Sequence, residues 1–223
     1  MCKNPRKIVG VGMNYIDHLE RVNFFGGPRV PPEHFIFFQK PVSSITGPYD
    51  PVFIPRDCYK LDYENEIGVI ISKPAKYIDK ANAYEYIAGF CIANDVSERS
   101  LQLQQPGQHE MGKSSDSFCP LGPFIVTPDD VDIVNMHLCT KLNGEIKQNG
   151  NTKSMIFEIP HLLAELSKYF TLQAGDIILT GTPHGVQLEE EILGNTPHYL
   201  QEGDVIELSI TGLGYQRNVI KRD

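Results

Sequence analysis

Short apolar runs, each stopped by glycine or proline, recur along the whole chain of 223 residues. The runs are of strand length, which is usually about 3–10 residues, and 19 glycines and 16 prolines punctuate them. This pattern favours strands joined by turns over a helical bundle. We therefore expect a mixed α/β, β-rich fold with a few outlying helices. Because no linker or change of composition divides the chain, we expect one domain over residues 1–223.

Three local signals refine this expectation. Asn143-Gly144 stands between two apolar-polar alternations and is typical of a type I′ turn, so it predicts a β-hairpin. Residues 158–170 carry leucines at helical spacing and predict an amphipathic helix. Residues 15–22 have room for one or two helical turns.

Composition excludes several classes of function. The net charge is −8 and no cluster of lysine and arginine stands out, which argues against a nucleic-acid partner. No apolar run approaches the roughly 18–20 residues of a membrane span. The start MCKNPRK is too short and polar for a signal peptide, and the five cysteines are odd in number without CxxC spacing. We expect a cytoplasmic protein, and a mitochondrial matrix location would give the same pattern.

The stretch KLDYENEIGVII, residues 60–71, places carboxylates at Asp62, Glu64 and Glu66. Alternate positions of a strand share one face, so an unbroken strand would bring three like charges together. The stretch runs directly into GVII, and a strand that is apolar on both faces is buried. A positive partner is therefore expected beside these carboxylates.

Asp95 ends another apolar run, AGFCIAND. Together with Glu64 and Glu66 it would supply three oxygen ligands of the kind that Mg²⁺ prefers, leaving other positions for substrate and water. An alternative interpretation makes Glu64 and Glu66 a solvated strand face. Asp95 would then be the N-cap of a helix beginning in VSERS.

Eight motifs resemble those of the fumarylacetoacetate hydrolase superfamily and occur in its order. They are GMNYIDH, KP at 40–41, DYENE, ANDVSERSLQ, GKSSDSFCPLGP, LNGEIKQNGNT, GDIILTGTPHG and EGDVIEL. The resemblance runs from about Lys7 to Val219 and is closest to the type that acts on acylpyruvates and oxaloacetate. It implies a β-sandwich roll with a few peripheral helices, and a homodimer. It also implies Mg²⁺ or Mn²⁺ held by Glu64, Glu66 and Asp95.

The same resemblance assigns roles to individual residues. His18 would be the general base, on a lid segment of about residues 16–33, and Lys113 would be the catalytic lysine. Arg99 and Gln102 would contact the substrate, and Thr182 would hold its carboxylate.

The implied activity is a Mg²⁺-dependent hydrolysis of the C–C bond in acylpyruvate-type, fumarylacetoacetate-like 2-keto acids, through a metal-bound enolate. The alternative activity is that of an oxaloacetate tautomerase or decarboxylase. Two further alternatives are a metal-binding family member without catalysis and an acidic structural or adaptor protein.

One position departs from the family pattern. Hydrolytic members usually carry a glutamate three positions after the histidine, where this chain has Arg21, and Glu20 stands only two positions after His18. On a helix, residues two apart do not face each other, whereas on an extended segment they do. We take Glu20 as the candidate catalytic partner of His18, on the condition that the segment is extended.

Overall fold

The computed structural model describes residues 5–21, 31–104 and 108–223. Most of the lid predicted for residues 16–33 lies outside these ranges, because residues 22–30 are not described. Its beginning is helix α1, Ile16–Arg21.

The largest sheet has seven strands in the order β2-β1-β12-β6-β7-β9-β3. It mixes antiparallel pairs with two parallel ones, β1 with β12 and β3 with β9. Its strands are β1 (Ile8–Gly12), β2 (Ile36–Lys40), β3 (Ile45–Thr46), β6 (Asn65–Ile71), β7 (Ile87–Asn94), β9 (Cys119–Val126) and β12 (Ile177–Leu179). Strand β6 lies between β12 and β7 and is buried at every residue, as its apolar sequence predicts.

A second sheet has five strands in the order β11-β10-β13-β14-β4. They are β4 (Val52–Ile54), β10 (His137–Leu142), β11 (Glu145–Asn151), β13 (Val205–Ile210) and β14 (Gly214–Arg222). Both residues of the turn between β10 and β11 have positive φ, 51° at Asn143 and 86° at Gly144, so the predicted hairpin is confirmed. A third sheet pairs only β5 (Leu61–Asp62) with β8 (Ser97–Glu98).

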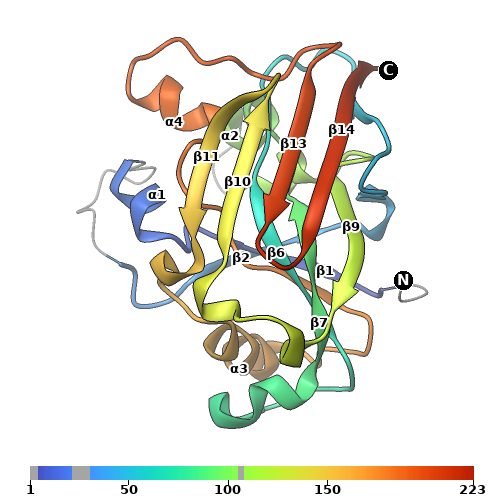
Figure 1. Ribbon diagram of the computed structural model, residues 1–223, viewed down its shortest axis with the longest axis vertical. Coiled ribbons are helices and arrows are strands. Elements are labelled where there is room, and N and C mark those ends of the chain that lie inside the picture. The colour runs from blue at the N-terminus through green and yellow to red at the C-terminus, as the bar shows by residue number, and fades with distance from the viewer. Residues whose placement is uncertain (1–4, 22–30, 105–107) are drawn as a thin grey trace.

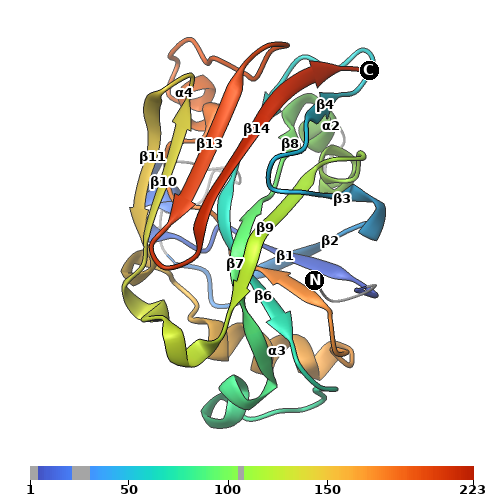
Figure 2. The same ribbon diagram turned by 45° about the vertical axis from the view of Figure 1, so that its right-hand side comes forward.

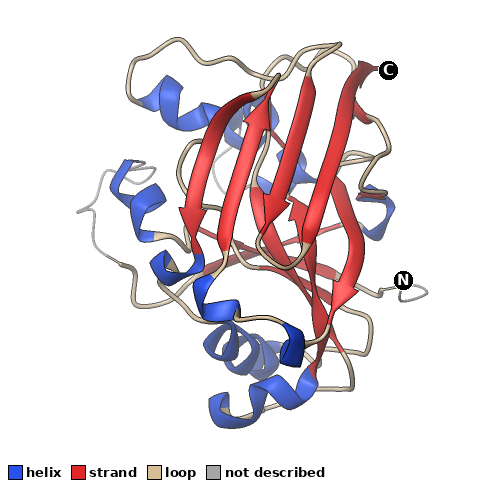
Figure 3. Cartoon of the chain, in the orientation of Figure 1, coloured by secondary structure: helices blue, strands red, loops and turns tan. Residues whose placement is uncertain are grey.

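The five-stranded sheet packs over the seven-stranded one, and the helices lie outside both (Figures 1, 2 and 3). One apolar core joins the layers: Ile67 and Ile92 of the larger sheet belong to the same buried cluster as Leu138 and Leu208 of the smaller. The expectation of a β-rich sandwich with few helices is confirmed.

The helices are short. The α-helices of the described residues are α1 (Ile16–Arg21), α2 (Arg99–Gln104), α3 (Ile159–Tyr169) and α4 (Gln187–Ile192). The 3₁₀ turns are η1 (Val42–Ser44), η2 (Lys80–Tyr86), η3 (His109–Lys113), η4 (Pro128–Asp130), η5 (Ile133–Asn135) and η6 (Thr152–Ser154). Helix α3 confirms the amphipathic helix predicted for residues 158–170, and its leucines are buried in the core. No helix in the described ranges is both long and apolar enough to cross a bilayer.

The carboxylate stretch does not form one continuous strand, which corrects the first interpretation of its alternation. Strand β5 ends at Asp62 and strand β6 begins at Asn65, so the chain leaves the extended ladder between them. Asp62 therefore belongs to the two-stranded sheet, opposite Ser97. Glu64 directly precedes strand β6 of the seven-stranded sheet, and Glu66 lies within it.

Candidate active site

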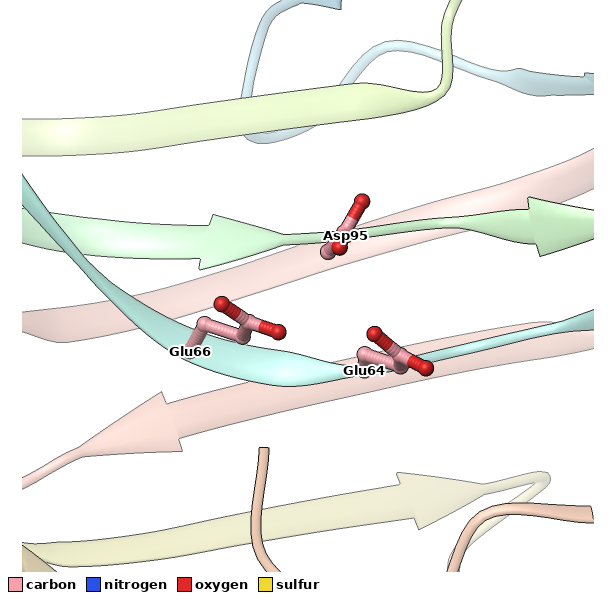
Figure 4. A group of neighbouring side chains, drawn as sticks. All are labelled: Glu64, Glu66 and Asp95. Atoms are coloured by element: carbon pink, nitrogen blue, oxygen red, sulfur yellow. The ribbon is translucent and has the colours of Figure 1, made fainter. Parts of the chain in front are cut away.

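Three carboxylates meet where β6 begins and β7 ends (Figure 4). Glu64, Glu66 and Asp95 each offer a carboxylate oxygen, and these oxygens all lie within 4.8 Å of one another. The strand pairing causes this, because Asn65 is opposite Asn94 and the Asp95 N–H donates to the Glu64 carbonyl at 2.9 Å. All three side chains are buried.

Positive side chains surround this cluster, as the sequence required. Lys113 Nζ lies 2.8 Å from Glu64 Oε2 and 2.7 Å from Asp95 Oδ2. Lys40 Nζ lies 2.6 Å from Asp95 Oδ1, and Arg99 Nη2 lies 2.8 Å from Glu64 Oε1. The alternative in which Asp95 caps a helix is wrong, because both of its oxygens are bound to lysines and the next helix begins only at Arg99.

Glu66 differs from its two neighbours. Within the parts of the chain that the structure describes, it forms no ion pair, and its Oε2 accepts a hydrogen bond from the Gly181 N–H at 2.7 Å. Burial, and then the adjacent Asp95 and Glu64 carboxylates, raise the pKa of Glu66 well above its usual range. Burial acts in the same direction on Glu64, but Lys113 and Arg99 outweigh it and hold the pKa of Glu64 below its usual range.

The hydrogen bond to Glu66 depends on a glycine. Gly181 has φ +88°, and a Cβ there would stand 2.8 Å from the Asn14 Cβ. An alanine at this position would be strained by its φ and would collide with Asn14. The TGTP turn thus brings its backbone N–H against Glu66 because residue 181 has no side chain.

The donor set fits a divalent metal ion. Three buried carboxylates provide hard oxygen ligands, and an ion such as Mg²⁺ or Mn²⁺ prefers these over nitrogen or sulfur. Burial and its neighbouring carboxylates disfavour the charged form of Glu66, and an ion bound here would stabilise that form. Glu64, Glu66 and Asp95, predicted as the ligands, are therefore brought together in an arrangement that can hold the ion.

The raised pKa of Glu66 predicts a pH-dependent stability in EDTA. The folded protein binds the Glu66 proton more tightly than the unfolded chain, whose glutamate titrates near 4.5. The Glu66 contribution to the free energy of unfolding is therefore complete below that pH and is lost as pH rises through the raised value. Glu64, whose pKa is lowered, loses its contribution at acid pH instead.

Calorimetric melting of wild type and Glu66→Gln in EDTA, from about pH 5 to about pH 8, isolates the contribution of Glu66 to the free energy of unfolding. We expect wild type to lose Tm relative to Glu66→Gln as pH rises, and Mn²⁺ to restore it. Melting curves that stay parallel over this range would contradict the assignment.

His18 is paired with a glutamate far along the chain. Its Nδ1 is hydrogen-bonded to Oε1 of Glu189, which is 171 residues away and fully buried. The other oxygen of Glu189 accepts from the Gly185 N–H at 2.8 Å, which fixes the carboxylate. His18 is buried in α1 and lines the same cavity as Glu64 and Glu66.

Glu20 does not meet the condition on which it was chosen. The segment is helical, because α1 spans Ile16–Arg21, and Glu20 is exposed to solvent. Two positions along a helix turn a side chain away from its neighbour, so Glu20 and His18 point in different directions. The partner of His18 in this structure is Glu189.

The remaining predicted residues line a cavity of about 310 Å³ beside the carboxylates. Arg99 Nη1 donates to Gln102 Oε1 at 2.9 Å, so these two side chains form one unit. Thr182 Oγ1 accepts from Gln148 Nε2 at 2.8 Å and donates to the Asn65 carbonyl at 3.1 Å. This volume suits a small ligand.

Part of the cavity lining is apolar and includes Ile36, Phe37, Leu103 and Leu188. The same cavity is lined by Glu64, Glu66, Lys113 and Arg99. Lys113 Nζ also lies 4.9 Å from the centroid of the Phe38 ring, so an aromatic face borders the charged end. A molecule with an anionic, metal-chelating end and a less polar tail would match a lining that combines charged and apolar side chains.

The sequence interpretation missed two residues of this site. Lys40 was noted only within the KP motif, and nothing near it indicated that its ammonium would bind Asp95. Glu189 stands in QLEEEIL among other acidic residues, and no local spacing links it to His18. Both contacts join segments that only the tertiary fold brings together.

Comparison with known proteins agrees with this geometry. Residues 7–221 match the family described as fumarylacetoacetate (FAA) hydrolase, C-terminal. The chain belongs to this family. A protein of Burkholderia multivorans with only the provisional name of hydrolase is 44% identical over 211 residues, which are 94% of this chain and 72% of that protein.

Two solved structures of family members share the fold. One is 5-carboxymethyl-2-hydroxymuconate delta-isomerase from Mycobacterium smegmatis, with TM-score 0.84 and 37% identity, covering 98% of this chain and 80% of that one. The other is maleylpyruvate hydrolase from Sphingobium sp. SYK-6 in complex with manganese(II) and pyruvate. It has TM-score 0.78 and 29% identity, covering 98% of this chain and 71% of that one. The family relatives thus include both isomerases and hydrolases.

Proposed function

We propose that this protein is a divalent-metal-dependent hydrolase that cleaves the C–C bond of small acylpyruvate-type 2-keto acids. The observation that carries the proposal is the buried His18–Glu189 pair, which lines the same cavity as the carboxylate cluster. A histidine held by a carboxylate is the arrangement that activates a water molecule. The manganese and pyruvate of the maleylpyruvate hydrolase relative support the same chemistry.

Glu64, Glu66 and Asp95 would hold the metal ion, with Mg²⁺ or Mn²⁺ as candidates. When bound, the ion would supply positive charge that polarises the keto group of a substrate. Arg99 and Thr182 line the cavity and would orient the substrate carboxylate, and Gln102, hydrogen-bonded to Arg99, would hold its guanidinium.

His18 is the proposed general base. Its Nδ1 is taken by Glu189, so Nε2 is the nitrogen left to remove a proton from water. The resulting hydroxide adds to the distal carbonyl carbon, and the C–C bond then breaks with its electron pair passing to C3 of the pyruvate portion. The products are a carboxylic acid and a pyruvate-type enolate that needs a proton on C3.

Lys113 is the proposed donor of that proton, or the positive charge that stabilises the enolate. Burial would lower the pKa of its ammonium, but Asp95 and Glu64 outweigh burial and raise it, which keeps Lys113 protonated. A charged ammonium in a buried site acts strongly on a developing negative charge.

Enol–keto isomerisation, or decarboxylation of oxaloacetate, is the second candidate function. The isomerase relative favours it. In this chain such a reaction would use the same carboxylates and Lys113 but would need no activated water. The His18–Glu189 pair gives the hydrolase proposal precedence, since water activation is what such a pair adds.

A panel of 2-keto acids, assayed with Mg²⁺, Mn²⁺ and EDTA, tests both. We expect acetylpyruvate or a longer acylpyruvate to be cleaved, and EDTA to stop the reaction. An enzyme that interconverts enol- and keto-oxaloacetate while leaving every acylpyruvate intact would replace the first proposal by the second.

The homodimer implied by the resemblance remains part of the proposal. A second hollow lies over the outer face of the seven-stranded sheet and is bordered by Phe124 and Ile125, which are 51% and 38% exposed. Such an apolar border suits a second copy of the chain. Light scattering on the purified protein, with Phe124→Asp as the disrupting variant, gives the test.

A further inference from the structure

Asp62 is a fully buried carboxylate for which the proposed mechanism has no task. Its Oδ1 accepts hydrogen bonds from the N–H groups of Tyr63 at 2.9 Å and Gln187 at 3.0 Å. Its Oδ2 accepts from Arg99 Nε at 2.9 Å and from the Leu188 N–H at 3.0 Å. Four donors thus converge on one side chain.

Two of these donors open helix α4, which has no cap of its own. The N-cap residue is Val186, whose side chain cannot accept a hydrogen bond. The first N–H groups of a helix need acceptors from elsewhere. Asp62 supplies them from 125 residues away in the sequence and also places a negative charge at the helix start.

The other contact of Asp62 fixes a substrate-contacting residue. Arg99 donates its Nε to Asp62, while its Nη2 lies between Asp62 at 2.9 Å and Glu64 at 2.8 Å. The guanidinium of Arg99 therefore bridges Asp62 and the carboxylate cluster. Pairing of β5 with β8, which places Asp62 opposite Ser97, brings these groups together.

We infer that Asp62 is a positioning residue that joins the two halves of the active site. The two carboxylate oxygens of Asp62 hold the start of α4, and Glu189 of that helix orients His18. The same carboxylate of Asp62 also orients Arg99. This role rests on the proposed function, because that function gives His18 and Arg99 their tasks. Asp62 touches neither substrate nor metal and acts only through these two residues.

Asp62→Asn is the informative variant, because it keeps the shape of the side chain. One of its polar atoms becomes an amide NH₂, which would face N–H donors instead of accepting from them. Asp176→Asn is a matched control. Asp176 is also fully buried and accepts four hydrogen bonds, from the N–H groups of Arg6, Lys7 and Gln173 and from Lys7 Nζ.

The first readout needs no turnover and so stays valid if the proposed activity fails. NMR of ¹⁵N-histidine-labelled protein should show a downfield, slowly exchanging Nδ1–H proton of His18, assigned by its loss in His18→Asn. We expect this resonance to disappear in Asp62→Asn and to persist in Asp176→Asn. Its persistence in a folded Asp62→Asn protein would overturn the link to Glu189.

The second readout is a double-mutant cycle on hydrolysis. Orienting partners of a site commonly contribute about 10–100-fold, and we expect a loss of kcat in this range for Asp62→Asn. Combined with Glu189→Gln, the total loss should be smaller than the product of the two single losses, because the part that passes through α4 is already gone. The losses of Asp176→Asn and Glu189→Gln should multiply in full, as independent changes do. Multiplying losses for Asp62→Asn and Glu189→Gln would overturn the proposal.

A rescue variant separates capping from the contact with Arg99. Val186→Thr keeps the shape of valine and gives α4 a capping hydroxyl at its own N-cap position. The double variant Asp62→Asn/Val186→Thr is compared with Val186→Thr alone. It should recover the His18 resonance and part of kcat. Failure to recover them would overturn the capping role. If Asp62→Asn does not fold, Asp62→Ser retains one acceptor and replaces it in each comparison.

Discussion

Replacing Glu66 by glutamine is expected to bring turnover of every 2-keto acid below detection, with either Mg²⁺ or Mn²⁺. Glu66 is the member of the carboxylate cluster without an ion pair in the described structure, and its charge is the one that a metal ion would compensate. Loss of an outer-shell partner commonly costs about 10–100-fold in metal affinity, so loss of a ligand should cost at least ~100-fold.

The fold should survive this change. A glutamine oxygen can still accept the hydrogen bond from the Gly181 N–H, and the repulsion with Glu64 and Asp95 is removed. Titration calorimetry with Mn²⁺ measures the affinity, and thermal melting in EDTA checks the fold. Glu191→Gln removes a carboxylate that is 39% exposed and paired with Lys60, so it should leave Mn²⁺ binding unchanged.

Two results would contradict the metal assignment. One is a Glu66→Gln protein that binds Mn²⁺ as tightly as wild type, and the other is a wild-type enzyme that is fully active in EDTA. Wild type without any affinity for Mg²⁺ or Mn²⁺ would instead favour an acidic structural or adaptor role over an enzyme.

Features coded by neighbouring residues were predictable from the sequence. Asn143-Gly144 makes a hairpin because both residues tolerate positive φ, and Ile159–Tyr169 makes a helix because its apolar side chains repeat at the helical period. The carboxylate cluster was also predictable from the sequence. Glu64 and Asp95 each flank an apolar run, and these runs pair as neighbouring strands β6 and β7.

Features set by tertiary contacts were not predictable in the same way. Glu189 of α4 reaches His18 of α1 only through the tertiary fold, and Lys40 reaches Asp95 from strand β2. Asp62 was assigned to the face of Glu64 because alternation alone cannot show that the ladder breaks between them. In each case the sequence gives the chemical group and the fold decides its partner.

Glu189→Gln should lose most of the ~10²–10⁴-fold that a general base commonly contributes to hydrolysis. Glutamine can still accept one hydrogen bond, but it cannot stabilise the positive charge that His18 gains when it removes a proton from water. Any enol–keto isomerisation should fall much less, because it proceeds without that water. Rates of acylpyruvate cleavage and of oxaloacetate enol–keto exchange, measured on the same preparation, give the comparison.

Two glutamates serve as matched controls. Glu190→Gln changes the next residue of α4, whose carboxylate binds the Asn195 side chain, and Glu20→Ala removes the exposed carboxylate nearest to His18 in the sequence. Substitutions of surface side chains that make no contact with a site usually change free energies by less than ~0.5 kcal/mol, so both rates should stay within about twofold of wild type. A Glu20→Ala loss larger than that of Glu189→Gln would show that α1 unwinds in the active enzyme. The segment that contains His18 and Arg21 would then be extended in the active enzyme, and Glu20 would orient His18.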